Sequence, residues 1–532
     1  MEPNQSSSGL PRRQVVITMA CAMTGLFLAA LDQTVVGTAM PRIIADLGGF
    51  DRYTWVTTAY IVASTITVPV VGRLSDIFGR KFFYLLGLIL FLIGSFASGT
   101  STSMDQLIAF RAFQGMGGGV LLSLAFVIVG DLFAPAERGK IQGVVAAVFG
   151  LSSVIGPTLG GFLTDTLSWN WIFYINLPIG IALVLLMLRF FPRLEPDAMD
   201  RSIDVVGILT LVLTVVPLLL GLSLAGVEYA WSSPIIIGLF ATSAVFLVAF
   251  IFTELRTKNP IMPLEIYKNG VISVALLAVF ITGFGMFSAI IFIPLFFQAA
   301  LGASATSSGS FLTPMMLGIV IGAAISGQIV SRIGGYRIPA TFGIVLMTTA
   351  AFLLSTMSAS TSYGVAISFI VALGFGLGFT FPSFTIAVQN SVEHRFLGVA
   401  TSAAQFARSI GGSLGLAVLG AYMTNTFQSQ LKDKLPAQVR DALGEERIVE
   451  LSENPAAMVN PDALHTLTSQ LGSSGVAADS LLSGLRDALA SSISGVFLVT
   501  FLILLTSVVV VLFLKDQPLR TEIGSRPPTT SN

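Results

Sequence analysis

Stretches of about twenty consecutive apolar residues recur along almost the whole chain, and they constrain the fold more than any other feature of the sequence. A helix needs about 20 such residues to cross the hydrocarbon core of a membrane. On this criterion we place about fourteen spans. They cover residues 15–38, 54–71, 82–98, 106–130, 139–164, 172–190, 205–225, 233–253, 271–298, 308–331, 338–357, 364–390, 398–424 and 491–514. The sequence therefore predicts an all-α polytopic membrane protein.

The scarcity of charge supports this assignment and excludes several function classes. Of the 532 residues, 54% are hydrophobic and 11% are charged, whereas a soluble domain carries roughly 25% charged residues. The 28 basic and 28 acidic side chains balance, so no nucleic-acid partner is expected. One cysteine (Cys21) and two histidines (His394 and His465) argue against a disulfide framework and a metal site. No GxxxxGK[ST] loop occurs, which excludes an ATP-driven pump, and neither a cofactor nor enzymatic activity is expected.

The distribution of Lys and Arg predicts the orientation of the spans. If the N-terminus is cytoplasmic, the loops and tail on that side carry nineteen basic residues, and the short loops on the other side carry only Arg42 and Arg52. Positive charge favours the cytoplasmic side. We therefore expect a multi-pass protein of the inner (cytoplasmic) membrane with both termini cytoplasmic. Residues 425–490 form the one sizeable segment outside the membrane, and they are expected to be either a short helical hairpin or a flexible loop.

The loop between the second and third spans has the sequence GRLSDIFGRK, from Gly72 to Lys81. Gly72 and Gly79 are expected to permit a tight turn, and Asp76 is expected near the start of the third helix, where a carboxylate suits the positive end of the helix dipole. A degenerate copy of this segment begins at Gly327, with Ser331 where the first copy has Asp76 and Gly335 where the first has Arg80.

This loop resembles the signature of the major facilitator superfamily, whose members are built from two related halves of six helices each. With fourteen spans, two further helices would be inserted between the halves. The resemblance implies a cytoplasmic N-terminus (1–14), an N-terminal six-helix half (15–190), a linker (191–204), two inserted helices (205–253), a second linker (254–270), a C-terminal six-helix half including the loop 425–490 (271–514), and a cytoplasmic tail (515–532).

Three further segments narrow the resemblance. They are LDQTVV at residues 31–36, WNWIFYINLPIG at residues 169–180, and a glycine-rich run that ends in GPTLGG at residues 156–161. Together they resemble the fourteen-helix drug:proton antiporters of the superfamily, multidrug efflux transporters associated with antibiotic resistance. The antiporter motif implied by this resemblance consists of Gly150, Gly156, Pro157, Gly160 and Gly161. From the residues alone, the spacing of Gly156 and Gly160 equally indicates simple close packing of helices.

Charged residues inside the membrane are costly and mark functional sites. Three stand well inside the expected spans: Asp32, Arg111 and Arg408. Asp32 and Arg111 share a depth of roughly 9 Å below the outer boundary, which favours a proton-coupling site, with a purely structural ion pair as the alternative. Arg408 is expected to snorkel or to bond between helices. The resemblance also implies that Asp131 reaches Arg80, forming a conformational latch with Gly72, Asp76 and Gly79.

These observations predict a proton-coupled antiporter that exports amphipathic or cationic compounds. The alternative is a facilitator that exports a specific metabolite, peptide or lipid. The cavity is expected near the midplane between the halves. Its candidate lining residues are Phe27, Trp55, Phe284, Phe287, Gln298 and Phe311. Small substrates, protons and membrane lipids are the expected partners, and a monomer is expected.

Overall fold

The computed structural model describes residues 10–49, 52–192, 201–299, 312–435, 440 and 478–522, which are almost entirely helical. The first helices are α1 (Arg12–Leu47), α2 (Tyr53–Phe78), α3 (Arg80–Gly99), α4 (Met104–Leu132), α5 (Pro135–Thr166), α6 (Trp171–Tyr174) and α7 (Asn176–Phe190). Two helices follow, α8 (Val205–Leu224) and α9 (Pro234–Arg256). The remainder forms α10 (Gly270–Ala299), α12 (Leu312–Ile333), α13 (Arg337–Ser355), α14 (Tyr363–Asn390), α15 (Leu397–Lys434) and α18 (Ala478–Leu512), with the short 3-10 helices η2 (Leu264–Lys268) and η3 (His394–Phe396).

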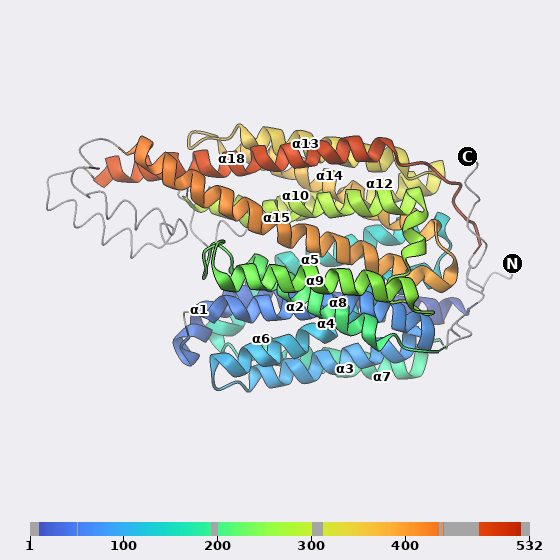
Figure 1. Cartoon of the computed structure of the whole chain (residues 1–532). Coiled ribbons are helices and arrows are strands. Elements are labelled where there is room, and N and C mark those ends of the chain that lie inside the picture. Colours follow the sequence, from blue (N-terminus) through green and yellow to red (C-terminus); the bar gives the residue numbers. More distant parts are fainter. Residues whose placement is uncertain are drawn as a thin grey trace.

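Thirteen helical segments of the described chain are long and apolar enough to cross a membrane, with α6 and α7 together counting as one. Helix α15 is the fourteenth. Its central part is rich in Ala, Ser, Thr and Gly and contains Arg408, so it is less apolar than the others. It nevertheless lies inside the bundle between α2, α10 and α18 (Figure 1). The prediction of an all-helical protein with about fourteen spans is therefore confirmed.

Figure 1 shows two groups of helices side by side. We call α1–α7 the N-half, and α10, α12–α15 and α18 the C-half. Each half has its own buried apolar core: Leu26, Tyr84 and Phe126 belong to the core of the N-half, and Met347 and Phe497 belong to that of the C-half. The halves meet where α5 packs on α12 and where α2 packs on α15.

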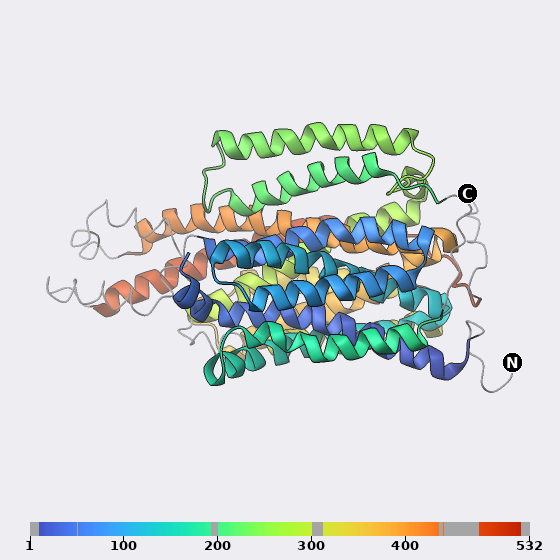
Figure 2. The same ribbon diagram turned by 90° about the horizontal axis from the view of Figure 1, so that it is seen from below.

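Helices α8 and α9 lie to one side of this bundle (Figure 2). Leu211, Val215 and Leu219 of α8 form an apolar cluster with Val62 of α2, and Phe406 of α15 packs against the same cluster. Helix α8 therefore touches both halves from outside. Helix α9 packs on α8, and only 17% of its most apolar stretch is buried, as expected for a helix that faces lipid.

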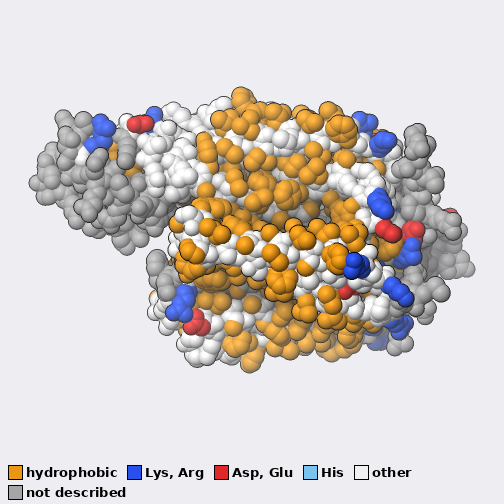
Figure 3. All heavy atoms as spheres, viewed as in Figure 1, with side chains coloured by type: hydrophobic (Ala, Val, Ile, Leu, Met, Phe, Trp, Pro, Cys, Tyr) orange, Lys and Arg blue, Asp and Glu red, His pale blue; other side chains and the backbone are white. Residues whose placement is uncertain are grey.

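The two ends of the bundle differ. Helix α1 begins and α18 ends at the same end (Figure 1), which we call the terminal end; we call the opposite end the loop end. Charged side chains gather at both ends, and a wide apolar belt separates them (Figure 3). At the loop end α15 continues to Lys434, and α18 begins at Ala478, so both helices run into the predicted 425–490 segment. Most of the hairpin expected there lies outside the described residues.

Local sequence sets several helix boundaries. Asp204 caps α8 by accepting a hydrogen bond from the backbone N–H of Gly207 at 2.8 Å, and Ser233 caps α9 by accepting one from Ile236. Both residue types are favoured at N-caps. Gly79 separates α2 from α3 with a φ of 97°, a conformation that residues with a Cβ rarely adopt. Gly79 therefore makes the tight turn that the sequence predicts.

Candidate functional site

Asp32 and Arg111 form an ion pair in the core of the N-half. Asp32 lies on α1 and Arg111 on α4, and Nη1 of Arg111 donates to Oδ2 of Asp32. Their side chains are 0% and 1% exposed, so the pair is sealed from solvent in this conformation. Because a buried charge is costly without a partner, each residue stabilises the other. The structure thus brings together the two residues that the sequence places at equal depth.

Two amide side chains complete this pair. Gln114 donates to Oδ1 of Asp32 at 2.8 Å and accepts from Nη1 of Arg111 at 2.8 Å. Asn176, in the first turn of α7, donates to the same Oδ1 at 3.2 Å and to Ser95 at 3.0 Å. Sequence reasoning did not single out Gln114 and Asn176. Both stand in conspicuous motifs, but only the tertiary structure shows that they face Asp32.

Aromatic rings enclose the guanidinium of Arg111. Its Cζ lies 4.3 Å from the ring centroid of Tyr60 and 5.8 Å from that of Phe173. Such cation–π contacts are stronger in a desolvated site. The Nε atom of Arg111 has no hydrogen-bond partner among the residues that the structure describes. Its Nη1 makes the bonds to both Asp32 and Gln114.

Arg408 lies on α15 in the C-half, and its environment corrects one expectation. The residue is 5% exposed, so it does not snorkel to water. Its Nη1 donates to Gln405 at 3.0 Å, and its Cζ lies 3.9 Å from the ring centroid of Phe381 on α14. Its Nε has no partner, and no acidic side chain of the described chain forms a salt bridge with it.

Glycines bring the two halves into backbone contact near the terminal end. A Cβ on Gly72 of α2 would lie 2.8 Å from the carbonyl oxygen of Gly398 at the start of α15, and a Cβ on Gly327 of α12 would lie 1.8 Å from that of Gly139 on α5. Gly72 thus lies inside a helix at a crossing of the halves, rather than in the tight turn expected for it. The first glycine of each loop copy occupies such a crossing.

Asp76 corrects a second expectation. It lies in the last turn of α2 rather than at the start of the third helix. Its Oδ1 accepts from the backbone N–H of Gly398 at 3.0 Å, and its Oδ2 accepts from that of Val399 at 2.9 Å. The carboxylate therefore does meet a helix N-terminus, where the free N–H groups favour negative charge, but that helix is α15 of the C-half. Asp76 of the N-half therefore bonds directly to the C-half.

Arg80 joins Asp76 to Asp131. Its Nη2 forms a salt bridge with Asp76, its Nε donates to Oδ2 of Asp131 at 2.9 Å, and its Nη1 donates to Ser75 at 2.7 Å. The other oxygen of Asp131, Oδ1, is buried without a hydrogen-bond partner. Nε2 of His394, from η3 of the C-half, lies 3.6 Å from this oxygen. The structure thus joins Arg80 and Asp131, and places a histidine next to them that sequence reasoning left unassigned.

Arg138 makes a further contact across the halves. From the first turns of α5 it donates to Gly130 at 2.6 Å and to Gln389 of α14 at 3.1 Å. Near the C-terminus of the described chain, Arg520 donates to the carbonyl of Gln389 at 2.8 Å, and its own carbonyl accepts from Ala136 of α5 at 3.3 Å. These bonds add to the closure of the terminal end.

The glycines of α5 fall into two groups. A Cβ on Gly156 would lie 2.0 Å from Oγ1 of Thr34, and one on Gly160 would lie 2.9 Å from the carbonyl oxygen of Val35, so α1 approaches this face closely. Gly150 faces α12, where a Cβ would lie 2.7 Å from Val320. By contrast, a Cβ on Gly161 would meet nothing within 4 Å, and Pro157 is exposed. At Gly150, Gly156 and Gly160 close helix packing therefore leaves no room for a side chain.

The candidate lining residues are spread over both halves. Phe284 is buried on α10 against Gly415 of α15, and Phe287 packs on Gly412 of the same helix. Phe27 on α1, Trp55 on α2 and Gln298 on α10 are half-buried. Phe311 lies outside the described residues.

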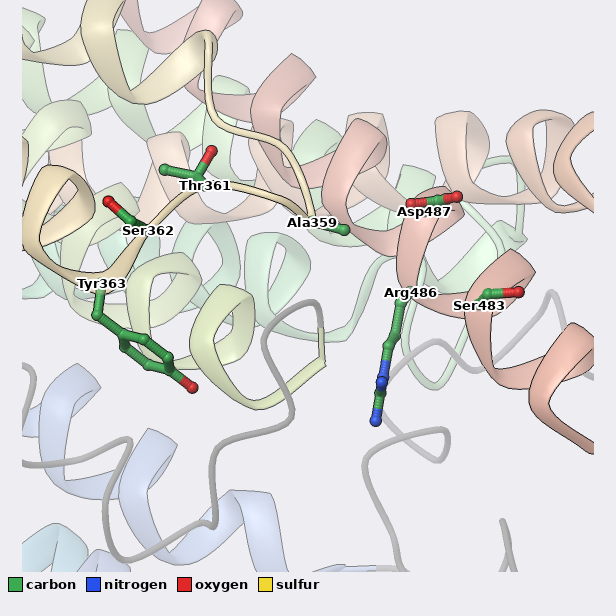
Figure 4. A pocket seen from close by; sticks show the side chains of 7 residues that line it. All are labelled: Ala359, Thr361, Ser362, Tyr363, Ser483, Arg486 and Asp487. Carbon is green, nitrogen blue, oxygen red and sulfur yellow. The ribbon is translucent and has the colours of Figure 1, made fainter.

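A hollow of about 480 Å³ lies at the loop end, away from the residues above. It opens between the segment that leads into α14 and the first turns of α18, with Tyr363 and Arg486 on opposite sides (Figure 4). Sequence reasoning assigned nothing to it.

A bundle of two helical halves that meet at one end around buried charges is the architecture of a secondary transporter. The comparison with known families agrees: the model described as Major Facilitator Superfamily matches residues 22–416. The chain belongs to the major facilitator superfamily.

Its relatives include proteins of assigned activity. It is 40% identical over 501 residues to the multidrug transporter protein MdtP of Bacillus subtilis, covering 92% of this chain and 91% of that one. It is also 40% identical to multidrug resistance protein 3 of the same bacterium, with 94% and 95% covered. The efflux pump dotC of Dothistroma septosporum is 33% identical, with 80% and 73% covered.

Solved structures share the fold at low sequence identity. The human organic anion transporter MFSD10 superposes with a TM-score of 0.60 at 17% identity, covering 93% of this chain and 100% of that one. A double Trp mutant of XylE superposes with a TM-score of 0.58 at 14% identity, with 95% and 97% covered. The chain is thus a multi-pass membrane protein of the major facilitator fold.

Proposed function

We propose that this protein exports small amphipathic compounds, cationic drugs among them, across the cytoplasmic membrane in exchange for protons. The observation that carries the proposal is the 40% identity, over more than nine-tenths of this chain, to two Bacillus proteins named for multidrug transport or resistance. At this level of identity and coverage the architecture of the substrate path is expected to be shared.

The Asp32–Arg111 pair is the proposed site of proton coupling. A carboxylate buried at membrane depth is costly and is retained where it serves a pathway. Asp32 accepts bonds from Arg111, Gln114 and Asn176. These donors stabilise the charged carboxylate while the site is closed. A proton that enters when the site opens would neutralise Asp32 and release Arg111, which links protonation to a rearrangement of α1 and α4.

The terminal end is the proposed cytoplasmic end. Nineteen basic residues against two favour this orientation, with both termini in the cytoplasm. The contacts of Asp76, Arg80, Asp131 and Arg138 then form a latch that closes the cytoplasmic side. In this assignment the described conformation faces outward. The cycle must break the Asp76 contact to load substrate from the cytoplasm.

The glycines of α5 are proposed to serve exchange by keeping α1 close. Gly156 and Gly160 pack against Thr34 and Val35, which follow Asp32 by one turn or less. Movement of α5 is therefore transmitted to the helix that carries the coupling carboxylate.

The remaining assignments follow from this scheme. Residues 15–190 and 271–514 are the two transporting halves, and residues 205–253 are a peripheral insertion that does not line the path. The cavity lies between the halves near the midplane, with Phe27, Trp55, Phe284, Phe287 and Gln298 as its candidate lining. The protein acts as a monomer in contact with lipid.

Transport by the purified protein in liposomes tests the proposal. Tetramethylrhodamine methyl ester, a permanent cation, is added outside, the membrane potential is clamped with potassium and an ionophore, and the lumen is made acidic. Protein molecules inserted with the terminal end outward should accumulate the dye in the lumen, and a protonophore should abolish the accumulation. Uptake that ignores the pH difference would contradict proton exchange, and absence of uptake across a panel of amphipathic dyes would contradict export.

A further inference from the structure

The surroundings of Arg408 and Arg111 correspond group by group. In each, Nη1 donates to a glutamine three residues away on the same helix, Gln114 at 2.8 Å and Gln405 at 3.0 Å. In each, an aromatic ring of a neighbouring helix lies under the guanidinium: Tyr60 for Arg111 at 4.3 Å, and Phe381 for Arg408 at 3.9 Å. The main difference is the carboxylate, although Arg111 also has a second ring, Phe173, nearby. Arg111 holds the carboxylate of Asp32, and Arg408 holds no carboxylate of the described chain.

An unpaired guanidinium at this depth needs a reason. Arg408 follows Leu397, the first residue of α15, by eleven residues, or about 16 Å along the helix, and it is 5% exposed. Its head group does not reach water at the end of the bundle. Burying a charge without a counter-charge costs several kcal/mol, and an apolar residue at this position would avoid that cost. The Nε atom is buried and has no hydrogen-bond partner among the described residues, so its N–H is available for an acceptor.

Arg408 lies close to a contact between the two halves. The next residue, Ser409, contacts Thr65 of α2 at 2.7 Å across the halves. About one and two turns further toward the loop end, Gly412 and Gly415 pack on Phe287 and Phe284 of α10. Arg408 is therefore one residue from the contact that closes the halves, and it lies on the same helix as a group of contacts with aromatic side chains.

We propose that Arg408 and Gln405 form a recognition site for the carboxylate of an exported compound, which takes the place that Asp32 occupies beside Arg111. The inference rests on the proposed export function and names a substrate class: amphipathic molecules that carry a carboxylate next to an aromatic ring system, zwitterions included. A guanidinium binds a carboxylate through two parallel N–H bonds. Phe381, which lies 3.9 Å from Cζ of Arg408, supplies a flat apolar surface for the rings.

The closed contact explains why the site is buried here. Thr65 and Ser409 touch, and a Cβ on Gly72 would lie 2.6 Å from Cβ of Ser402, so α2 covers this stretch of α15. Separation of the halves at the terminal end uncovers it. A carboxylate from the cytoplasm would then reach Arg408 in the conformation that loads substrate.

Binding to the purified protein in lipid nanodiscs tests the proposal. Two dyes differ only at the relevant group: tetramethylrhodamine has a free carboxylate, and its methyl ester does not. The wild type should bind the free acid more tightly than the ester. Arg408→Gln should weaken binding of the acid by about ten- to a hundredfold, the range of a charge-assisted pair, and leave the ester unchanged or bound more tightly.

A second variant avoids the risk of misfolding. Gln405→Glu places a carboxylate where Oε1 of Gln405 now accepts from Arg408, so it supplies the missing partner without removing the cation. It should abolish the preference for the acid. Arg256→Gln is the matched control, because Arg256 also stacks on a phenylalanine, Phe252 at 3.7 Å, but is exposed at the end of α9. It should leave both affinities as in the wild type.

The outcomes separate this proposal from the export function. Equal affinities of the wild type for acid and ester, or an equal loss of both in Arg408→Gln and Gln405→Glu, would overturn the carboxylate site. These binding measurements need no proton gradient. Failure of proton-driven uptake in liposomes with the acid preference intact would instead overturn the export function and leave the binding site standing.

Discussion

The two halves of this protein share their backbone contacts and differ in their charges. The first glycine of each loop copy, Gly72 or Gly327, brings a helix of its half against the opposite half. Asp76 then bonds two backbone N–H groups of α15. Its counterpart in the second copy, Ser331, lies beside Gly139 of α5, and its hydroxyl has no hydrogen-bond partner in the part of the chain that the structure describes.

The same division holds in the core. Arg111 of the N-half is paired with Asp32, whereas Arg408 of the C-half forms no salt bridge with any acidic side chain that the structure describes. The glycines therefore give both halves the same close helix crossings, whereas the buried charges differ between the halves. In our proposal the N-half responds to protons and closes the latch, and the C-half recognises the substrate.

The sharpest test of this division is Asp32→Asn. If Asp32 couples protons as proposed, loss of its carboxylate should lower proton-driven dye uptake about a hundredfold or more, the usual contribution of a positioned proton-transfer group. The variant should still bind the carboxylate dye at Arg408. Asp165→Asn, at an exposed position of α5, is the control. Proton-driven uptake that persists in Asp32→Asn would remove the coupling site from the N-half.

The shared glycines should matter equally in both halves. In Gly327→Ala the added methyl would lie 1.8 Å from a backbone oxygen, and in Gly72→Ala it would lie 2.8 Å from one. Overpacking of this kind costs about 1–3 kcal/mol and should open the terminal end. Spin labels at Lys140 on α5 and Arg332 on α12, both exposed, would report the opening as a longer distance. Gly238→Ala, where a Cβ meets nothing within 4 Å, should change nothing; unchanged distances in both crossing variants would refute the packing role.

The charges of the two loop copies should matter unequally. Asp76→Asn removes charge from two bonds to α15 and should destabilise closure by about 1–2 kcal/mol, lowering transport roughly tenfold with membrane insertion intact. Ser331→Ala removes a hydroxyl without a partner and should be tolerated. Dye uptake, normalised to the amount of inserted protein, compares them. Equal effects of the two substitutions would show that the charge of Asp76 does not distinguish the two loop copies.

The smallest expected effect concerns the contact of His394 at the terminal end. Its side chain is 31% exposed, and its Nε2 lies 3.6 Å from Oδ1 of Asp131, which also pairs with Arg80. His394→Ala removes this contact between the halves. A polar contact this exposed contributes about 0.2–1 kcal/mol, at most about fivefold in the closed population, so the label distance should lengthen only slightly. A label distance equal to that of the wild type would exclude a role of His394 in closure.

Sequence reasoning found the chemistry of the site more readily than its geometry. The equal depth of Asp32 and Arg111 follows from counting helical residues, and the structure shows that the two side chains form an ion pair. The sequence did not identify Gln114 and Asn176 as site residues. An uncharged amide side chain inside a membrane span does not by itself indicate a functional site, and only its partner in the folded protein reveals the role. The sequence predicts that Asp76 meets the N-terminus of the third helix, whereas it meets the N-terminus of α15. A loop motif contains no information about a helix that begins more than 300 residues later.

Sequence by itself determined the membrane location, about fourteen spans and the family, because apolar runs and glycine motifs are properties of consecutive residues. The tertiary structure alone showed the contacts of the buried charges with Gln114, Asn176 and Gly398. Asp32 and Arg111 are 79 positions apart, and Asp76 bonds an amide 322 positions away. It also decided that Arg408, which the sequence predicts to snorkel or to bond between helices, is buried on α15 against Phe381 of α14, with no acidic partner among the described residues. The physical reason is that burial and pairing depend on how helices rotate and cross, and hydropathy along one helix carries no information about its neighbours.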